Sequence, residues 1–420
     1  MTSINDHLQF LGPLPRHINS PSYDIAAYYL AEKYNLKVSR LTEEDEVNGW
    51  VIPPKYSLIS GYIKDINNAI VLDASNHPLS VISYSSAIDK LVSREELLSH
   101  CHYDHRCNDN IPYHFRQSYR PWHRDWGFCM TKTFYDNLTD DSYHVSINVT
   151  NGPKELLIVE ADSNPSSQIT FVLAAHLDHP GMVNDDLTGV ITICEAFKRL
   201  SSASIFNIKL VLLPEIIGAE LYLQKQDAFT DGIFVESVGI DTGKFYLQQP
   251  MVLCSQVPNI CKTLNKYNIE IVPSRFIFGN DECIFESFGC PMSEINRGYF
   301  SEYHSDKDNA SLIDINSIHE TIDLIVDIVT KFQQKTFYKK NFKGTVCCSN
   351  PMYNLYIEPG QPVFGEEFLA HELRPVMDAI PLLPSIFSLE DILAVTNCDY
   401  DVTKKYLDQW CNLGLITLLS

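Results

Sequence analysis

Several residues that could bind a metal or move a proton lie beside apolar stretches that are typical of strands. His176 ends the stretch QITFVLAAH, and Asp185 follows nine residues later in GMVNDDLTG, just before a helical pattern. Glu215 ends IKLVLLPE, and His304 lies in EYHSDKDN. A catalytic zinc takes about three imidazole or carboxylate ligands and keeps one position for water. The sequence therefore predicts a metal bound by His176, Asp185 and His304.

Two further carboxylates have predicted roles beside that metal. Glu215 can accept a proton from the attacking water and pass it to the leaving group. Asp178, two residues after His176 on the same extended backbone, suits an acceptor for the other ring N–H of that histidine. The alternative is that these acids only end strands or begin helices, where acidic groups are favoured. His179, in the same stretch, is expected to start a Pro–Gly turn.

Alternating strand and helix patterns must position these residues. Strand patterns occur in HVSINVT, KELLIVEA, QITFVLAAH, IKLVLLPE and GIFVESVGI, and helical patterns in DLTGVITICEAFKRL, GAELYLQKQDAF and the amphipathic residues 318–334. This alternation predicts an α/β core with a doubly wound, mostly parallel sheet. Ligands of such sheets lie at the carboxyl ends of the strands, which is where these candidates stand.

Changes in the residue pattern along the sequence divide the chain into three units. Residues 1–44 and 129–344 are expected to form the α/β core. Residues 45–128 contain short β-branched stretches separated by Pro, Asn and Gly, which predicts a small β-rich domain inserted into the core. Residues 345–420 end in a pattern of helix, turn, helix, Gly and strand, which predicts a winged-helix-like domain.

The candidate motifs, in this order, resemble the zinc aminopeptidase and glutaminyl-cyclase superfamily. The motifs are HLD, NDDLTG, PE, NDECIFESFGCPMSEI and YHSDKDN. The resemblance implies that His176, Asp185 and His304 bind metal, that Glu215 is the general base, and that Asp281 lies in the site without binding metal directly. YIKD, VISYS, WGFCMT, PEIIGA and EPG resemble, more closely, bacterial aminopeptidase-like proteins that carry an inserted small β domain and a C-terminal winged helix.

The sequence departs from that superfamily at Ile216. The dizinc aminopeptidases have a second glutamate there that binds metal, and isoleucine cannot replace it. A further carboxylate ligand is expected near the end of GIFVESVGID, at Glu236 or, failing that, Asp241. We therefore expect one zinc ion per chain, with a second metal as the alternative.

Several functions fit this picture. The first is a metallo-aminopeptidase-like hydrolase that cleaves a peptide or small amide. The alternatives are an amidohydrolase or deacylase of an N-acyl metabolite, a glutaminyl cyclotransferase, and a catalytically degenerate peptide-binding or scaffold protein. A competing metal candidate is HCHYDHRC, at residues 100–107, but no second ligand pair follows it at zinc-finger spacing.

The charge and composition of the chain restrict the kinds of partner that we expect it to bind. Acidic residues number 53 and basic residues 32, so the formal net charge is −21. This charge disfavours nucleic acid, and DVTKKYLDQW adds only two lysines to the expected winged helix. The sequence has no run of 18 apolar residues and begins without a secretory signal pattern. We therefore expect a cytoplasmic protein with free thiols and no membrane partner. A homo-oligomer is an open possibility.

Overall fold

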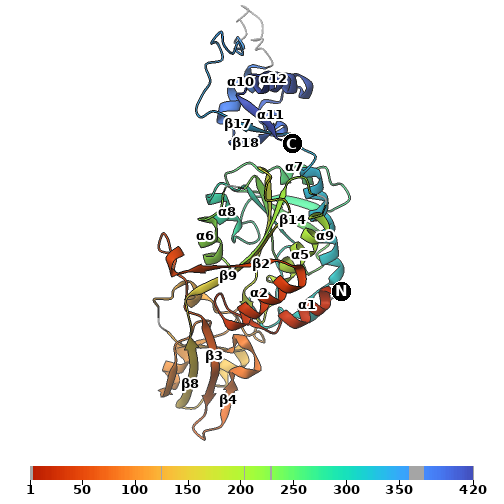
Figure 1. The fold of residues 1–420 in the computed structure, drawn as a ribbon. Helices are drawn as coiled ribbons and strands as arrows, with labels where there is room; N and C mark the ends of the chain where they lie inside the picture. Colours follow the sequence, from red (N-terminus) through yellow and green to blue (C-terminus); the bar gives the residue numbers. More distant parts are fainter. Residues whose placement is uncertain (1–2, 124, 203, 228, 359–372, 420) are drawn as a thin grey trace, which may run out of the picture.

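An eight-stranded sheet forms the centre of the protein (Figure 1). The computed structural model describes residues 3–419 apart from 124, 203, 228 and 359–372. In order across the sheet, the strands are β15 (Ile269–Val272), β14 (Phe245–Gln248), β16 (Met292–Asn296), β13 (Asp231–Val235), β10 (Thr170–His176), β12 (Asn207–Leu213), β9 (Glu155–Asp162) and β2 (Lys37–Thr42). Strands β12, β10, β13 and β16 are parallel, which confirms the predicted doubly wound, mostly parallel core.

Helices cover both faces of this sheet. One face carries α1 (Ile4–Leu11), α2 (Pro21–Tyr34), α5 (Leu187–Leu200) and α9 (Ile315–Phe332), and the other carries α6 (Ile217–Leu223) and α8 (Glu282–Ser287). Alternate residues of a strand point to opposite faces. In β10, Leu173 and Ala175 therefore join one apolar cluster, whereas Val172 and Ala174 join the other. Burial on both faces explains why these strands are apolar throughout.

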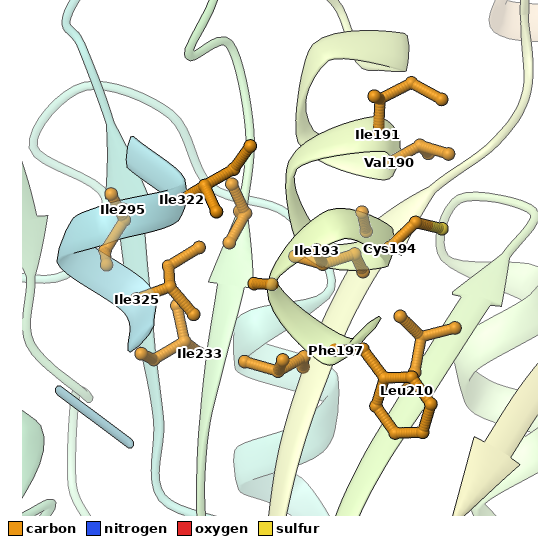
Figure 2. Packing of buried hydrophobic residues seen from close by; sticks show 14 of the residues in the cluster. Val190, Ile191, Ile193, Cys194, Phe197, Leu210, Ile233, Ile295, Ile322 and Ile325 are labelled. Carbon is orange, nitrogen blue, oxygen red and sulfur yellow. The ribbon is translucent and has the colours of Figure 1, made fainter. Parts of the chain in front are cut away.

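Helices α5 and α9 pack side by side on the sheet, as Figure 2 shows. Ile322 and Ile325 of α9 belong to the same buried cluster as Ile233 of β13. Gly189 lets the first turn of α5 approach β13, because a Cβ at this position would lie 2.3 Å from the carbonyl oxygen of Val235. This contact fixes α5, and with it the turn that carries Asp185, against the carboxyl end of β13.

A second, four-stranded antiparallel sheet lies at one end of the core (Figure 1). Its strands, in order, are β4 (Ile70–Asp73), β3 (Tyr56–Lys64), β8 (Ser142–Asn151) and β5 (Ile88–Ser93). The sequence placed β8 in the α/β core, but it pairs with β3 and β5 instead. The boundary expected at residue 128 therefore separates β8 from its partners, because a strand pattern does not reveal which sheet a strand joins.

The C-terminal unit lies at the opposite end of the core (Figure 1). It contains a three-stranded antiparallel sheet and, among the described residues, helices α10 (Arg374–Ala379), α11 (Leu389–Thr396) and α12 (Tyr400–Asn412). The sheet has β17 (Phe337–Lys340) between β18 (Ile386–Ser388) and β19 (Ile416–Leu419). Its central strand precedes the boundary expected at residue 345. The winged-helix assignment stays a prediction.

Candidate metal centre

The parallel strands end at the same edge of the sheet, so the residues at their carboxyl ends lie near one another. His176 is the last residue of β10, Glu215 lies two residues beyond β12, and Glu236 directly follows β13. His176 and Glu236 are completely buried, and the side chain of Glu215 is 16% exposed. The described part of the edge therefore combines an imidazole, a partly accessible carboxylate and a buried carboxylate.

Asp185 lies at the middle of this site and contacts three imidazoles. Its Oδ1 is 3.2 Å from Nε2 of His176 and 3.1 Å from Nδ1 of His179. Its Oδ2 is 3.1 Å from Nε2 of His304. Burial alone would raise the pKa of Asp185, but the surrounding imidazoles hold it well below its ordinary value. An ionised carboxylate surrounded by ring nitrogens is a suitable ligand for a divalent metal.

The polar atoms of this group fit a metal. Both ring nitrogens of His176, both carboxylate oxygens of Asp185 and Nε2 of His304 are buried, and none has a hydrogen-bond partner among the described residues. Buried polar atoms are nearly always satisfied, and such exceptions are typical of sites for an ion. The set of imidazole nitrogen and carboxylate oxygen is the one that zinc prefers. Of the residues expected from sequence, Asp185 contacts both His176 and His304, through different carboxylate oxygens. Among the described residues, the group with metal-binding spacing contains His176 and Asp185 but not His304.

His179 is a member of the site that sequence reasoning missed. Its ring is 2% exposed, and its Nε2 is 3.3 Å from Oε2 of Glu215. Two groups of described residues have ligand atoms within 4.8 Å of one another, and His179 belongs to both: one with His176 and Asp185, the other with Asp178 and Glu215. The sequence analysis assigned this histidine to the start of a Pro–Gly turn.

Glu215 is held between two donors. The hydroxyl group of Tyr119, from the segment inserted before β8, donates a hydrogen bond to Glu215, and His179 lies on the same oxygen. Burial would raise the pKa of Glu215, but these hydrogen bonds and the neighbouring imidazoles lower it to about 2. Glu215 is therefore ionised at neutral pH, as a general base must be.

Asp178 lies close to His176, but its hydrogen bond goes elsewhere. Its Oδ1 is 3.8 Å from Nδ1 of His176, which is too long for a hydrogen bond. The same oxygen accepts a 2.8 Å hydrogen bond from the backbone N–H of Glu215. Asp178 thus fixes the backbone at Glu215 in the structure, whereas its expected bond to the ring of His176 is not formed.

The other acidic candidates differ in their positions. Glu236 accepts a hydrogen bond of 2.9 Å from Asn280, and burial raises its pKa well above the ordinary value. Asp281 is buried and accepts a hydrogen bond from the backbone N–H of Ile216. Asp241 is exposed and caps a local turn at Gly243, away from the buried cluster. Of the two alternatives for a further ligand, only Glu236 is buried at the end of a strand.

The competing stretch at residues 100–107 has no comparable arrangement. His100 stacks on Trp126, and His102 stacks on His114. None of the described residues in this stretch belongs to a group with metal-binding spacing. The structure therefore does not support HCHYDHRC as a competing zinc site.

Two buried charged residues hold the loops of the site. The carboxylate of Asp308 accepts three backbone hydrogen bonds, of 3.2, 2.6 and 3.0 Å, from residues 183–185. The guanidinium of Arg16 donates to the carbonyl groups of Leu177 and Met182, at 3.0 and 2.7 Å. These bonds fix both ends of the segment that carries Asp178, His179 and Asp185.

The small β-rich unit also contributes to the site. The backbone N–H of Tyr113 donates to the carbonyl group of His304 at 2.9 Å, and Pro112 forms a bridge with Ser305. The ring of Tyr113 contacts the rings of both His179 and His304 edge to face. The inserted unit therefore holds the loop that carries His304 and covers one side of the imidazole cluster.

Comparisons with known structures define the class of fold. A "putative peptidase" from Clostridium acetobutylicum superposes with a TM-score of 0.72 at 21% identity, covering 99% of this chain and 96% of that one. The zinc aminopeptidase BSAP from Bacillus subtilis superposes with a TM-score of 0.58 at 12% identity, covering 79% of this chain and 95% of that one. The core of this protein therefore has the zinc aminopeptidase fold, and the expected resemblance is confirmed at the level of the fold.

Sequence comparisons also point to proteins with an aminopeptidase-like domain. A Clostridium acetobutylicum protein described as a "putative polysaccharide biosynthesis protein with aminopeptidase-like domain" is 24% identical over 342 residues, covering 79% of this chain and 78% of that protein. Residues 55–150 match a family model described as "Domain of unknown function (DUF2172)". This match spans β3 to β8, which supports the structural assignment of β8 to the small β-rich unit.

No described helix combines the length and the apolarity needed to cross a bilayer.

Proposed function

We propose that this protein is a metal-dependent hydrolase of peptide or amide bonds, with zinc bound by His176, Asp185 and His304. The observation that carries the proposal is the buried carboxylate of Asp185, which contacts imidazoles from separate parts of the chain beside an ionised Glu215. A zinc ion bound there would lower the pKa of a water molecule and polarise a carbonyl group. The zinc aminopeptidase fold supports the same class of reaction.

The protein side chains would handle the proton. Glu215, ionised and partly accessible, accepts a proton from the attacking water and gives it to the departing amine. Tyr119 and the backbone bond from Glu215 to Asp178 hold the base in place. The aromatic cover from the inserted unit keeps bulk water away from one side of the imidazole cluster.

The test combines metal analysis with turnover by the full-length protein. We expect about one zinc ion per chain. We also expect cleavage within a panel of aminoacyl anilides and N-acyl amides. Glu215→Gln should keep its zinc and lose about 10²- to 10⁴-fold in kcat, the usual contribution of a general base. Glu220→Gln, which changes a half-buried carboxylate on α6, is the matched control and should keep wild-type activity.

The possible outcomes separate the candidate functions. Wild-type protein that binds no zinc contradicts the proposal, as does full activity in Glu215→Gln. Full zinc occupancy without turnover on any amide would favour the peptide-binding or scaffold alternative.

A second candidate is hydrolysis of the amide of an N-acyl sugar. It is favoured by the description of the Clostridium acetobutylicum relative, which names polysaccharide biosynthesis. Turnover of N-acyl sugars without turnover of aminoacyl anilides would support it over aminopeptidase activity.

A cytoplasmic location agrees with the absence of disulfides among the described cysteines.

A further inference from the structure

Resting on the proposed zinc centre, we infer that His179 is an additional metal ligand, which binds through Nδ1 while its Nε2–H holds the base Glu215. The sequence has isoleucine at 216, directly after Glu215, and so supplies no second carboxylate there. His179 places a nitrogen at the centre from a different element. The arrangement would link the metal and the general base through one imidazole. With four protein ligands, the attacking water would bind as a fifth ligand.

The spacing of the atoms fits a shared metal. Neighbouring ligand atoms on a tetrahedral zinc lie about 3.3 Å apart when each bond is about 2.0 Å long. Nδ1 of His179 and Nε2 of His176 lie 3.1 and 3.2 Å from the same oxygen of Asp185. Nδ1 of His179 is also buried and has no hydrogen-bond partner among the described residues. A ligand position explains both the spacing and the unsatisfied nitrogen.

The second nitrogen of the ring supports the same tautomer. Metal-binding histidines usually donate their other ring N–H to a carboxylate, which fixes the tautomer and the ring orientation. Nε2 of His179 lies 3.3 Å from Oε2 of Glu215. With the proton on Nε2, the lone pair of Nδ1 points to the side of the ring where Asp185 lies.

The fold holds this ring in place against a backbone preference. His179 has φ of 80°, in the left-handed region, which costs a non-glycine residue about 1 kcal/mol or more. The two-residue strand β11 (His179–Pro180) pairs with β1 (Pro15–Arg16), and Arg16 is opposite His179. A turn alone would not need a histidine in this conformation, since asparagine or glycine adopts it more readily.

The number of imidazoles bound to the zinc can be measured directly. X-ray absorption of the zinc-loaded wild-type protein should show imidazole scattering from His176, His179 and His304, and His179→Phe should show one imidazole fewer per chain. Phenylalanine keeps a ring against Tyr113 but has no nitrogen. Zinc affinity, measured by competition with a chromophoric chelator, should fall by more than about 100-fold, beyond the loss typical of residues that only support a ligand.

Control variants guard against loss of folding. His114→Phe removes an imidazole that stacks on His102 outside the centre, and it should leave both the imidazole count and the zinc affinity unchanged. His179→Gln tests the same position with a flexible, polar side chain.

The outcomes distinguish this inference from the proposed function. An imidazole count that is the same in zinc-loaded wild type and in zinc-loaded His179→Phe overturns the role of His179 and leaves the proposed function standing. A wild-type protein that binds no zinc overturns the proposed function itself.

Discussion

Replacement of Arg16 is expected to destabilise both the core and the metal centre. Arg16 is completely buried, and its guanidinium donates hydrogen bonds to the carbonyl groups of Leu11, Leu177 and Met182. Burial lowers its pKa to about 10, so the group is still charged at neutral pH. These bonds join the end of α1 to both ends of the loop that carries His179.

The expected loss in the free energy of unfolding follows from these contacts. A hydrogen bond that involves a charged group contributes about 1.5–3 kcal/mol, so the three bonds together contribute about 4–9 kcal/mol. In Arg16→Met, the apolar side chain fills most of the volume and no guanidinium charge has to be buried. We therefore expect the free energy of unfolding to fall by about 3–5 kcal/mol, because three buried carbonyl groups lose their donor at a cost of about 1–3 kcal/mol each.

Urea denaturation followed by circular dichroism measures this loss, and zinc analysis after dialysis measures its effect on the site. Arg16→Lys keeps the charge but cannot reach three carbonyl groups, so its loss should be intermediate. Arg40→Met is the control, because the Arg40 side chain is 56% exposed and surface ion pairs contribute only about 0–1 kcal/mol. A loss below about 1 kcal/mol in Arg16→Met, with zinc binding intact, would refute this reasoning.

Three further predictions follow from particular contacts. Tyr119→Phe removes a donor from Glu215, so the pKa of Glu215 should rise and the acid limb of the kcat/KM profile should move to higher pH; an unmoved limb would contradict the role of the hydroxyl. Burial raises the pKa of Asp231 to about 7, so the contribution of this group to the free energy of unfolding should fall by about 4 kcal/mol as the pH rises from about 4 to about 7. Asp231→Asn should remove this fall, and equal urea midpoint shifts in both proteins across this range would contradict the prediction. Gly189→Ala should lower the melting temperature sharply, because its Cβ would lie 2.3 Å from the carbonyl oxygen of Val235; a melting temperature near that of the wild type would show that α5 can move away from β13.

The elements around the site could be predicted because their patterns are local. Helices α5 and α9 and the buried strands β10 and β12 have the apolar spacing that the sequence indicated. His176 and Glu215 were found because parallel strands deliver their carboxyl ends to one edge of a sheet. Asp185 and His304 were predicted from their ligand types and their positions in loops, and the order of motifs that resembles the zinc aminopeptidases implied the same roles.

Strand partners could not be predicted in the same way. The pattern of residues 142–151 correctly indicated a strand, but not that it would join β3 and β5 rather than the core sheet. No strand was expected at β17, which pairs with strands that begin more than 40 residues later. Pairing depends on contacts between distant segments, and an alternating or apolar pattern is satisfied equally well by either sheet.

By itself, the sequence determined the class of the core, its strands β9, β10, β12 and β13, its helices α5, α6 and α9, and the candidate residues at the ends of those strands, because these depend on side-chain periodicity. Only the tertiary structure decided that His179 lies between Asp185 and Glu215, that Tyr119 reaches Glu215 from the inserted unit, and that Asp178 bonds to the backbone instead of His176. The physical reason is that a single backbone angle at His179, and the docking of one unit on another, set the directions of side chains that the spacing along the chain leaves open.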